Sequence, residues 1–246
     1  MASIFDEDYF IPPLSKFSFS FPNPRFASDE GLLAYGGGLE PNRILSAYRH
    51  GIFPWFNEND PILWWSPNPR LVLYPKDFKV SKSFRKILKN RKFFVKFDNN
   101  FELTINLCAK IREQKEGTWL IKPMREAYTE LYHMGFAHSV EVYDQNNEFW
   151  GGLYGVAMGK AFFGESMVSI KPNGSKIALK ALSDVLSLRG YHFIDCQVPT
   201  PHLQSLGAKL VDRDIFLDEL EVALNSGGDD LGSWSNFKWE YKDGWW

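Results

Sequence analysis

The residues best suited to chemistry lie in one short segment, Phe193-Ile194-Asp195-Cys196-Gln197-Val198. Its β-branched and aromatic residues stand between Gly190 and Pro199, which predicts a buried strand bounded by turns. Side chains alternate between the two faces of a strand, so Asp195 and Gln197 are expected on one face, about 7 Å apart. A buried charge is costly unless it is paired or used. Either that face is open to water, or Asp195 and Gln197 form a catalytic pair.

The segments before this strand predict the sheet that would hold it. Residues 139–143, 149–157 and 161–167 have the composition of strands joined by short turns, which is typical of an antiparallel meander. A helix follows, with Ser175 as its expected N-cap and Gly190 as its C-terminal stop. The strand–helix–strand order makes the last pairing parallel. The sequence thus predicts an α+β (mixed α/β) fold with a mixed, mostly antiparallel sheet.

Basic residues are concentrated between Lys76 and Lys96, where nine Lys and Arg stand against one acidic residue, Asp77. A helix over residues 80–88 with Ser81 as its N-cap is predicted there. Such a helix would align four basic side chains on one face, at positions i, i+3, i+4 and i+7: Lys82, Arg85, Lys86 and Lys89. This face is either solvated or binds a polyanion.

Aromatic residues make up 16% of the chain, and three tryptophans fall within eleven residues, at Trp55, Trp64 and Trp65. Prolines interrupt the segment, so it cannot form a regular helix. The three rings could be part of a core, or they could form a platform on which a nucleobase stacks.

Length and composition set the class of protein. A chain of 246 residues with 44% hydrophobic and 24% charged residues fits a globular protein of one large or two small domains. No apolar run reaches the roughly 18 residues of a membrane helix, and the first residues do not resemble a signal peptide. Both cysteines, Cys108 and Cys196, lie in apolar segments, so we expect free thiols and a cytoplasmic protein. Metal-site, phosphate-loop and nucleophile-elbow spacings are absent.

Short motifs along the chain together resemble one family. They are LLAYGG at 32–37, YRHGIFPWF at 48–56, WWSP at 64–67, EGTW at 116–119, GGLYG at 151–155, FGESM at 163–167 and IDCQ at 194–197. In this order and at these spacings, from about residue 20 to about residue 220, they resemble the leucyl/phenylalanyl-tRNA–protein transferases.

The resemblance implies an enzyme that transfers Leu or Phe from aminoacyl-tRNA to the α-amine of proteins beginning with Arg or Lys. Such a transfer marks these proteins for degradation by the N-end rule pathway. The family has a small N-terminal domain and a C-terminal acetyltransferase-like (GNAT) domain, and uses neither metal nor CoA. We accordingly expect domains at 1–75 and 76–225, a tail at 226–246, and a monomer.

The resemblance also implies roles for individual residues. Asp195 and Gln197 match the catalytic pair. The residues that match the surroundings of the aminoacyl-adenosine are Trp55, Trp119, Tyr128 and Glu165. The residues that match the apolar amino-acid pocket are Leu153, Phe162, Leu182, Leu186 and Ile194. Position 153 is often Met in the family, and 182 and 186 are often Phe, so the pocket stays apolar but its preference between Leu and Phe is open.

The implied reaction is aminolysis of an activated ester, in which positioning of amine and carbonyl is the main task. Asp195 would accept the proton of the amine, directly or through Gln197; alternatively a tRNA ribose hydroxyl moves the proton and Asp195 only orients the amine. Glu165 could balance the charge of the acceptor's Arg or Lys. An apolar pocket should also accept Met. The basic helix would hold the acceptor stem through phosphates.

Two other classes compete with this interpretation. A CoA-dependent N-acetyltransferase is compatible with the fold, but its pyrophosphate-binding loop does not occur in the sequence. A tRNA-binding module without catalysis is the other alternative, against which the combination of Asp195, Gln197 and Glu165 argues.

Overall fold

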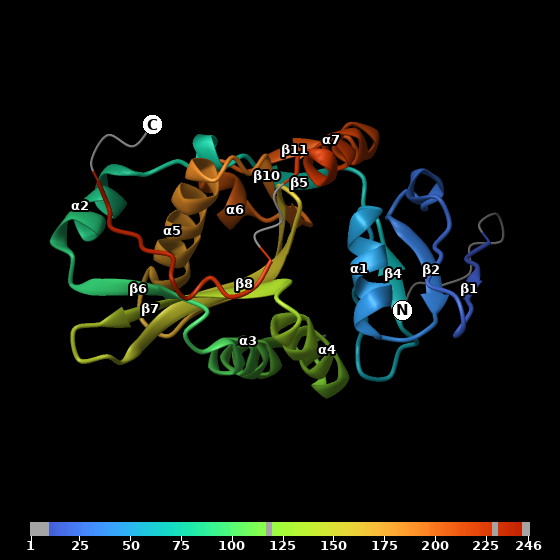
Figure 1. Ribbon diagram of the computed structural model, residues 1–246, viewed down its shortest axis with the longest axis horizontal. Helices are drawn as coiled ribbons and strands as arrows, with labels where there is room; N and C mark the ends of the chain where they lie inside the picture. Colours follow the sequence, from blue (N-terminus) through green and yellow to red (C-terminus); the bar gives the residue numbers. More distant parts are fainter. Residues whose placement is uncertain (1–9, 117–119, 228–230, 243–246) are drawn as a thin grey trace.

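The computed structural model describes residues 10–116, 120–227 and 231–242 (Figure 1). A small four-stranded sheet near the N-terminus has the order β1 (Pro13–Leu14), β2 (Leu32–Gly36), β4 (Leu63–Trp65), β3 (Phe53–Pro54). Helix α1 (Pro41–Arg49) packs beside it and begins at the predicted proline. A short 3₁₀ helix at Pro24–Phe26 precedes β2.

The second sheet has seven strands in the order β11-β5-β10-β9-β8-β7-β6. Their bounds are β11 Lys209–Val211, β5 Arg70–Leu73, β10 Phe193–Gln197, β9 Ala161–Ser169, β8 Phe149–Met158, β7 Ala137–Asp144 and β6 Phe93–Phe97. Only β9 and β10 pair in parallel, and every other pairing in this sheet is antiparallel. The predicted meander, the parallel pair and the mixed, mostly antiparallel sheet are all confirmed.

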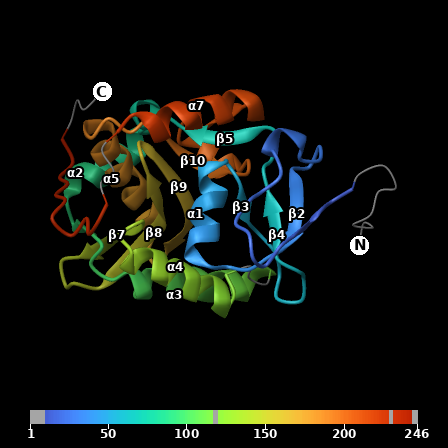
Figure 2. The ribbon, with the colours of Figure 1, turned by 45° about the vertical axis from the view of Figure 1, so that its right-hand side comes forward.

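Helices cover both faces of the large sheet (Figures 1 and 2). The core on one face includes residues of α3 (Phe101–Glu116), α4 (Lys122–His133), α7 (Arg213–Asn225) and α1. The core on the other face includes residues of α2 (Lys82–Asn90) and α5 (Gly174–Leu188). A 3₁₀ helix at Pro75–Asp77 and helix α6 (Pro201–Ser205) complete the elements. The small sheet therefore joins the large one through α1 and its neighbours, which belong to the first of these cores.

The predicted N-cap is correct for helix α2 and wrong for helix α5. Ser81 caps α2, as predicted, because its hydroxyl accepts a hydrogen bond from the Phe84 N–H. Ser175 is not the cap of α5: the helix begins one residue earlier, after Asn173 in the left-handed conformation with φ 67°. The Ser175 N–H and hydroxyl both bond to the Ser169 hydroxyl at 2.9 Å, so its side chain ties the helix to the end of β9.

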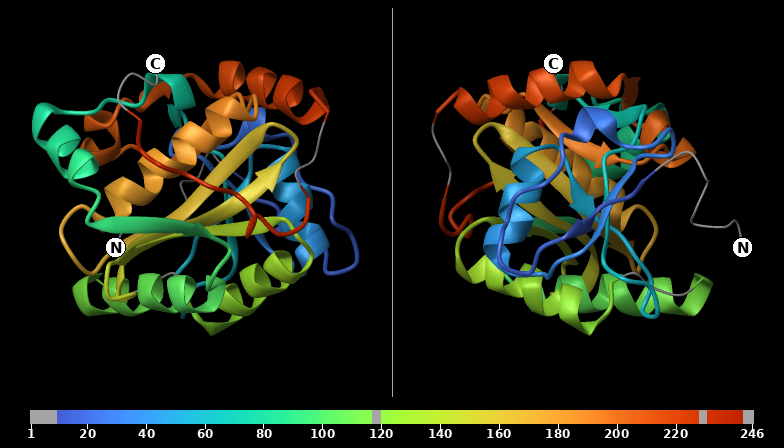
Figure 3. Two further views of the ribbon diagram at one scale, coloured as in Figure 1. Left: turned by 60° about the vertical axis from the view of Figure 1, so that its left-hand side comes forward. Right: turned by 90° about the vertical axis from the view of Figure 1, so that its right-hand side faces the viewer.

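The large sheet begins earlier in the chain than the predicted domain division at 75/76. Strand β5, at Arg70–Leu73, lies between β10 and the edge strand β11 of that sheet. The described part of the tail is docked, because Trp234 and Tyr241 belong to the core beneath α5. Figure 3 shows the tail crossing the face of the sheet next to that helix.

Candidate active site

A cavity of about 170 Å³ opens where β9 and β10 stop pairing. Its walls come from β3, β8, β9, α5, β10 and α6, and they are mostly apolar. Seven of the residues singled out in the sequence line it: Trp55, Leu153, Phe162, Glu165, Leu182, Ile194 and Gln197. Glu165 and Gln197 are polar groups within an apolar enclosure, the arrangement expected of a ligand site.

Three other predicted residues do not line the cavity, and a fourth is not described. Leu186 is fully buried one turn further along α5 and does not line the cavity. Tyr128 lies behind the wall and reaches the site through Glu165. Asp195 is fully buried and also absent from the lining. Trp119 lies outside the described residues.

Two β-bulges open the sheet at this point. Pairing of β9 with β10 ends at Asp195 and Phe163. Beyond it, β10 carries Cys196 as an extra residue opposite β5, and β9 carries Glu165 as an extra residue opposite β8. A β-bulge bends its strand and redirects a side chain, which is why bulges occur beside functional sites. Glycine at 155 makes the second bulge possible, because a Cβ there would lie 2.1 Å from the Phe163 carbonyl oxygen.

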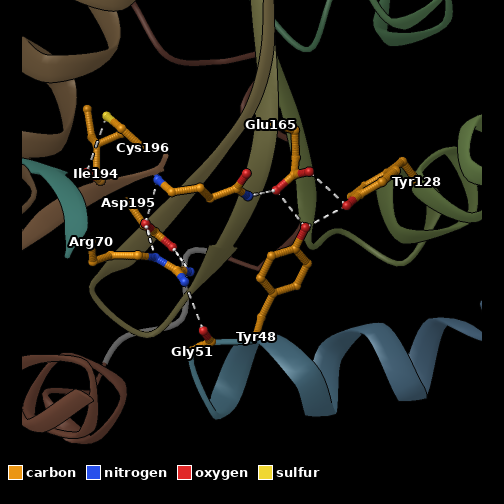
Figure 4. Close-up of polar contacts among 9 residues, drawn as sticks. Tyr48, Gly51, Arg70, Tyr128, Glu165, Ile194, Asp195 and Cys196 are labelled. Carbon is orange, nitrogen blue, oxygen red and sulfur yellow. Dashed lines mark hydrogen bonds and ion pairs between the residues drawn. The ribbon is translucent and has the colours of Figure 1, made fainter. Parts of the chain in front are cut away.

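The bulge at Cys196 interrupts the regular strand between Asp195 and Gln197. Gln197 has φ 63°, a left-handed conformation that few residues other than glycine adopt. Its side chain lines the cavity and its amide binds Glu165, whereas the Asp195 carboxylate binds Arg70 (Figure 4). Of the two residues, only Gln197 is among those that line the cavity.

Asp195 is held by a buried ion pair with Arg70 of β5. The guanidinium donates from Nε at 2.8 Å and from Nη2 at 2.6 Å to the two carboxylate oxygens, and both side chains are fully buried. The rings of Phe53 and Phe216 stack on the guanidinium, 4.8 and 4.6 Å away. Asp195 Oδ1 also accepts the Gln197 N–H at 2.9 Å. The carboxylate is thus held by the Arg70 guanidinium and in turn holds the strained backbone of Gln197 through its N–H.

Glu165 has a different set of partners. Its Oε1 accepts from the Tyr48 hydroxyl at 2.6 Å and from the Gln197 amide at 2.7 Å, and its Oε2 accepts from the Tyr128 hydroxyl at 2.8 Å. The two tyrosine oxygens are also 2.6 Å apart. Burial and, to a smaller extent, the charge of Asp195 raise the pKa of Glu165 to about 7, against the lowering effect of the hydrogen bonds from Tyr48, Tyr128 and Gln197.

The number of protons in this cluster matters. Tyr48, Tyr128 and Glu165 make three oxygen–oxygen contacts with one another, but the two hydroxyls supply only two protons. Burial and the nearby Glu165 raise the pKa of both tyrosines, so their hydroxyls keep those protons. A proton on Glu165 supplies the third hydrogen bond and closes the ring, with one tyrosine hydroxyl then accepting from the carboxyl and donating to the other hydroxyl. The geometry thus agrees with a carboxyl that holds a proton near neutral pH.

Two of these partners carried no assigned role in the sequence reasoning. Tyr48 was only the first residue of the motif at 48–56, and Arg70 was outside the motifs. The signal for Arg70 was present, because a charged residue in the apolar strand Arg70–Leu73 must find a counter-charge if the strand is buried.

Of the tryptophans at 55, 64 and 65, one is part of a core and another is exposed beside the cavity. Trp64 is fully buried in the N-terminal core, and its indole N–H donates to the Gly36 carbonyl. Trp55 is 43% exposed and lines the cavity, with the Trp65 ring 5.7 Å away. The exposed ring at the cavity mouth is thus the one available for stacking.

The predicted basic helix is present. Phe84 and Leu88 of α2 are buried against the α5 side of the protein. Lys82, Lys86 and Lys89 are exposed, and Arg85 is half-buried. Lys176 of α5 lies over the Phe84 ring, so the basic surface continues from α2 to the N-terminal end of α5.

Comparison with known proteins identifies the family. A model of the leucyl/phenylalanyl-tRNA protein transferases matches residues 72–221, and a model of their N-terminal domain matches residues 37–68. The chain is 49% identical to the leucyl/phenylalanyl-tRNA–protein transferase of Lawsonia intracellularis over 218 residues, 88% of this chain and 95% of the relative. It is also 49% identical to that of Sulfurimonas denitrificans over 232 residues, 94% of this chain and 97% of the relative.

The chain therefore belongs to the leucyl/phenylalanyl-tRNA–protein transferase family, and it is an aminoacyltransferase. Among solved structures, an acetyltransferase from Pyrococcus furiosus aligns with 46% of this chain and 88% of its own, with a TM-score of 0.37 and 10% identity. Within the described residues, no helix has the length and apolar character needed to cross a membrane. The same residues contain no group of three His, Cys, Asp or Glu side chains arranged to hold a metal.

Proposed function

We propose that the protein transfers Leu or Phe, and also Met, from aminoacyl-tRNA to the α-amine of proteins that begin with Arg or Lys. The product would carry the N-terminal residue that marks a protein for the N-end rule pathway, and the reaction would take place in the cytoplasm, where charged tRNA is made. The observation that carries the proposal is the apolar cavity with Glu165 and Gln197 at its polar end.

The apolar walls are the basis of amino-acid choice. Leu153, Phe162, Leu182 and Ile194 offer no hydrogen-bond partner, so a polar side chain would lose its hydration without compensation. Apolar pockets discriminate weakly between side chains that differ by one methylene, by about 1–3 kcal/mol. Acceptance of Met beside Leu and Phe follows from that weakness.

Gln197 is the residue placed to receive the amine. Its Nε2 donates to Glu165, which leaves its Oε1 as the acceptor for an N–H of the substrate. In the reaction the amine nitrogen bonds to the ester carbonyl carbon, the ester C–O bond breaks, and the amine proton ends on the ribose oxygen that leaves. Asp195 is separated from the cavity and holds Gln197 through its backbone N–H. This geometry favours positioning by Asp195 over direct proton removal.

A transfer assay tests the function. The protein is mixed with charged Phe-tRNA and a peptide beginning with Arg, and the product is analysed by mass. Addition of one Phe residue is expected; the same peptide beginning with Asp should remain unmodified. Acetyl-CoA in place of charged tRNA separates the acetyltransferase alternative, since an added acetyl group would contradict the proposal, and no product with either donor would support a binding module.

Two variants test the roles within the site. In Asp195→Asn, near-normal transfer at saturating substrate would refute a base role for Asp195. Gln197→Glu keeps the shape of the side chain but changes its hydrogen-bond donors, and it should lower kcat more than it raises KM. Glu165→Gln tests the counter-charge role. If Glu165 recognises the acceptor's Arg or Lys, this variant loses discrimination against neutral N-termini; unchanged discrimination argues against that role.

The basic face of α2 is proposed to hold the acceptor stem. Each phosphate contact contributes about 0.7 to 0.9 to the slope of log K against log salt. Replacing Lys82, Arg85 and Lys86 by Ala should therefore weaken tRNA binding and reduce the slope by about two. The matched control carries Ala at three basic residues on the opposite side of the sheet: Lys110, Lys122 and Arg125. An unchanged slope in the α2 variant, or an equal change in the control, contradicts this placement.

A further inference from the structure

The C-terminal tail lies outside the part of the chain that the family model matches, which ends at residue 221. Within it, Trp234 is only 1% exposed. Its backbone N–H donates to Asp98 Oδ2 at 2.7 Å, and its indole stacks on the His138 ring at 3.8 Å with an interplanar angle of 5°. Asp98 in turn binds His138 Nδ1 at 2.9 Å, so a buried polar pair receives the tail. Trp234 is thus built into the core of the enzyme.

Trp234 also touches the wall of the cavity from behind. Its ring centroid is 5.9 Å from that of Phe162, and Phe162 lines the cavity. Phe237 stacks on the other side of Trp234 at 5.1 Å. Phe162 is therefore confined between the space that would hold the substrate side chain and an indole supplied by the tail. A core ring keeps its position only while its neighbours fill the space behind it.

A second tryptophan anchors the tail without this contact. The Trp239 indole N–H donates to Asp184 Oδ2 at 2.9 Å, and its ring stacks on Phe93 at 6.4 Å. Neither Asp184 nor Phe93 lines the cavity. The tail thus has one anchor, Trp234, that contacts the cavity wall and another, Trp239, whose given contacts do not reach that wall.

We propose that Trp234 is a positioning residue that sets the depth of the amino-acid pocket by holding Phe162 in place. The proposal rests on the proposed function of the same cavity. When the indole is removed, the Phe162 ring can move back into the vacated space and the pocket deepens. A deeper pocket still contacts a Phe side chain but loses contact with the shorter Leu side chain. The ratio of kcat/KM for Phe-tRNA over Leu-tRNA should then rise, by about tenfold for a lost contact of methylene size.

The experiment compares Trp234→Leu with Trp239→Leu in the full-length protein. Both substitutions weaken tail docking, and thermal unfolding measures that shared effect. We expect the Phe/Leu ratio to rise in Trp234→Leu and to stay at the wild-type value in Trp239→Leu. Trp234→Phe, which keeps a ring against His138, covers the case in which the leucine variant does not fold; it should shift the ratio in the same direction by less.

Two results would overturn the proposal. One is an unchanged Phe/Leu ratio in a folded Trp234 variant, and the other is an equal shift in the Trp239 variant, which would assign the effect to tail docking in general. A wild-type protein that transfers neither amino acid is a separate outcome, because it refutes the proposed function itself.

Discussion

Two buried carboxyl groups lie on either side of Gln197, and their surroundings differ in kind. Asp195 binds the Gln197 backbone N–H and is paired with the Arg70 guanidinium. Glu165 binds the Gln197 side-chain amide and is otherwise surrounded by neutral hydroxyl groups. A cation next to a buried carboxylate stabilises its charge, whereas neutral donors compensate burial only in part. Gln197 is thus bound at its backbone by a carboxylate that is paired with a cation, and at its side chain by a carboxyl group among neutral donors.

The difference suggests a division of tasks. The Asp195 ion pair is fully enclosed and holds a strained backbone, so it contributes geometry. Glu165 lines the cavity, and burial raises its pKa to about 7, so its charge can change near neutral pH. A group with a pKa near the ambient pH can gain and lose a proton, which suits an acid–base role.

The largest expected contrast is between the isosteric substitutions Asp195→Asn and Glu165→Gln. The first leaves the Arg70 guanidinium, which cannot lose its proton, buried without a counter-charge, and should lower the free energy of unfolding by about 3–5 kcal/mol. The second replaces a carboxyl by a neutral amide, whose oxygen accepts from one tyrosine and whose NH2 can donate to the hydroxyl oxygen of the other, and should cost about 1 kcal/mol at pH 7. Urea unfolding at pH 7 measures both. Equal costs would mean that the two carboxyl groups do not differ as described.

A double substitution then isolates the charge pair. Arg70→Met alone leaves Asp195 buried without its cation and should cost about 3 kcal/mol. Adding Asp195→Leu removes the unpaired charge, so the double variant should be more stable than the sum of the two single losses by about 2 kcal/mol. The same unfolding assay gives this coupling. Strict additivity would show that packing around Phe53 and Phe216, and not the charge pair, carries the stability.

Some features of the fold and the site could be predicted from the sequence, and others could not. The start of α1 at Pro41, the Ser81 cap and the β7–β8–β9 meander were predictable because each depends on neighbours in the chain. The pairing of Arg70 with Asp195 was not, because 125 residues separate them. The two bulges could not be predicted either, because the alternation of side chains along a strand assumes regular hydrogen bonding to its neighbour. The family resemblance named seven of the residues that line the cavity, but it could not supply their contacts.

The pH dependence of stability sharpens the comparison further. The folded protein binds the Glu165 proton more tightly than the unfolded chain, because the pKa is about 7 in the fold against 4.5 for the free side chain. The stabilisation is therefore complete below about pH 4.5 and lost as the pH rises through about 7, with a total of about 3 kcal/mol. Glu165→Gln has no such proton, so the wild type should lose stability relative to this variant over that window.

The difference between the two unfolding curves is the quantity to follow. Burial also raises the pKa of Glu141, and its contribution is present in both proteins and cancels. Parallel curves from pH 5 to pH 8 would contradict the assignment of this titration to Glu165.

The smallest effects come from the two tyrosines, and they should be unequal. Tyr128→Phe leaves Glu165 Oε2 without the hydroxyl donor it has in the fold, whereas Tyr48→Phe leaves Oε1 still bound to the Gln197 amide. Losing a donor to the charged form raises the pKa of Glu165 further, and the Tyr128 variant should show the greater rise. Each loss should cost about 1 kcal/mol at pH 8, where the carboxylate is charged, and less at pH 5, where it is protonated. A carboxyl titration followed by carbon NMR gives the pKa directly. If both variants titrate like the wild type, the two hydroxyl groups do not stabilise the Glu165 carboxylate.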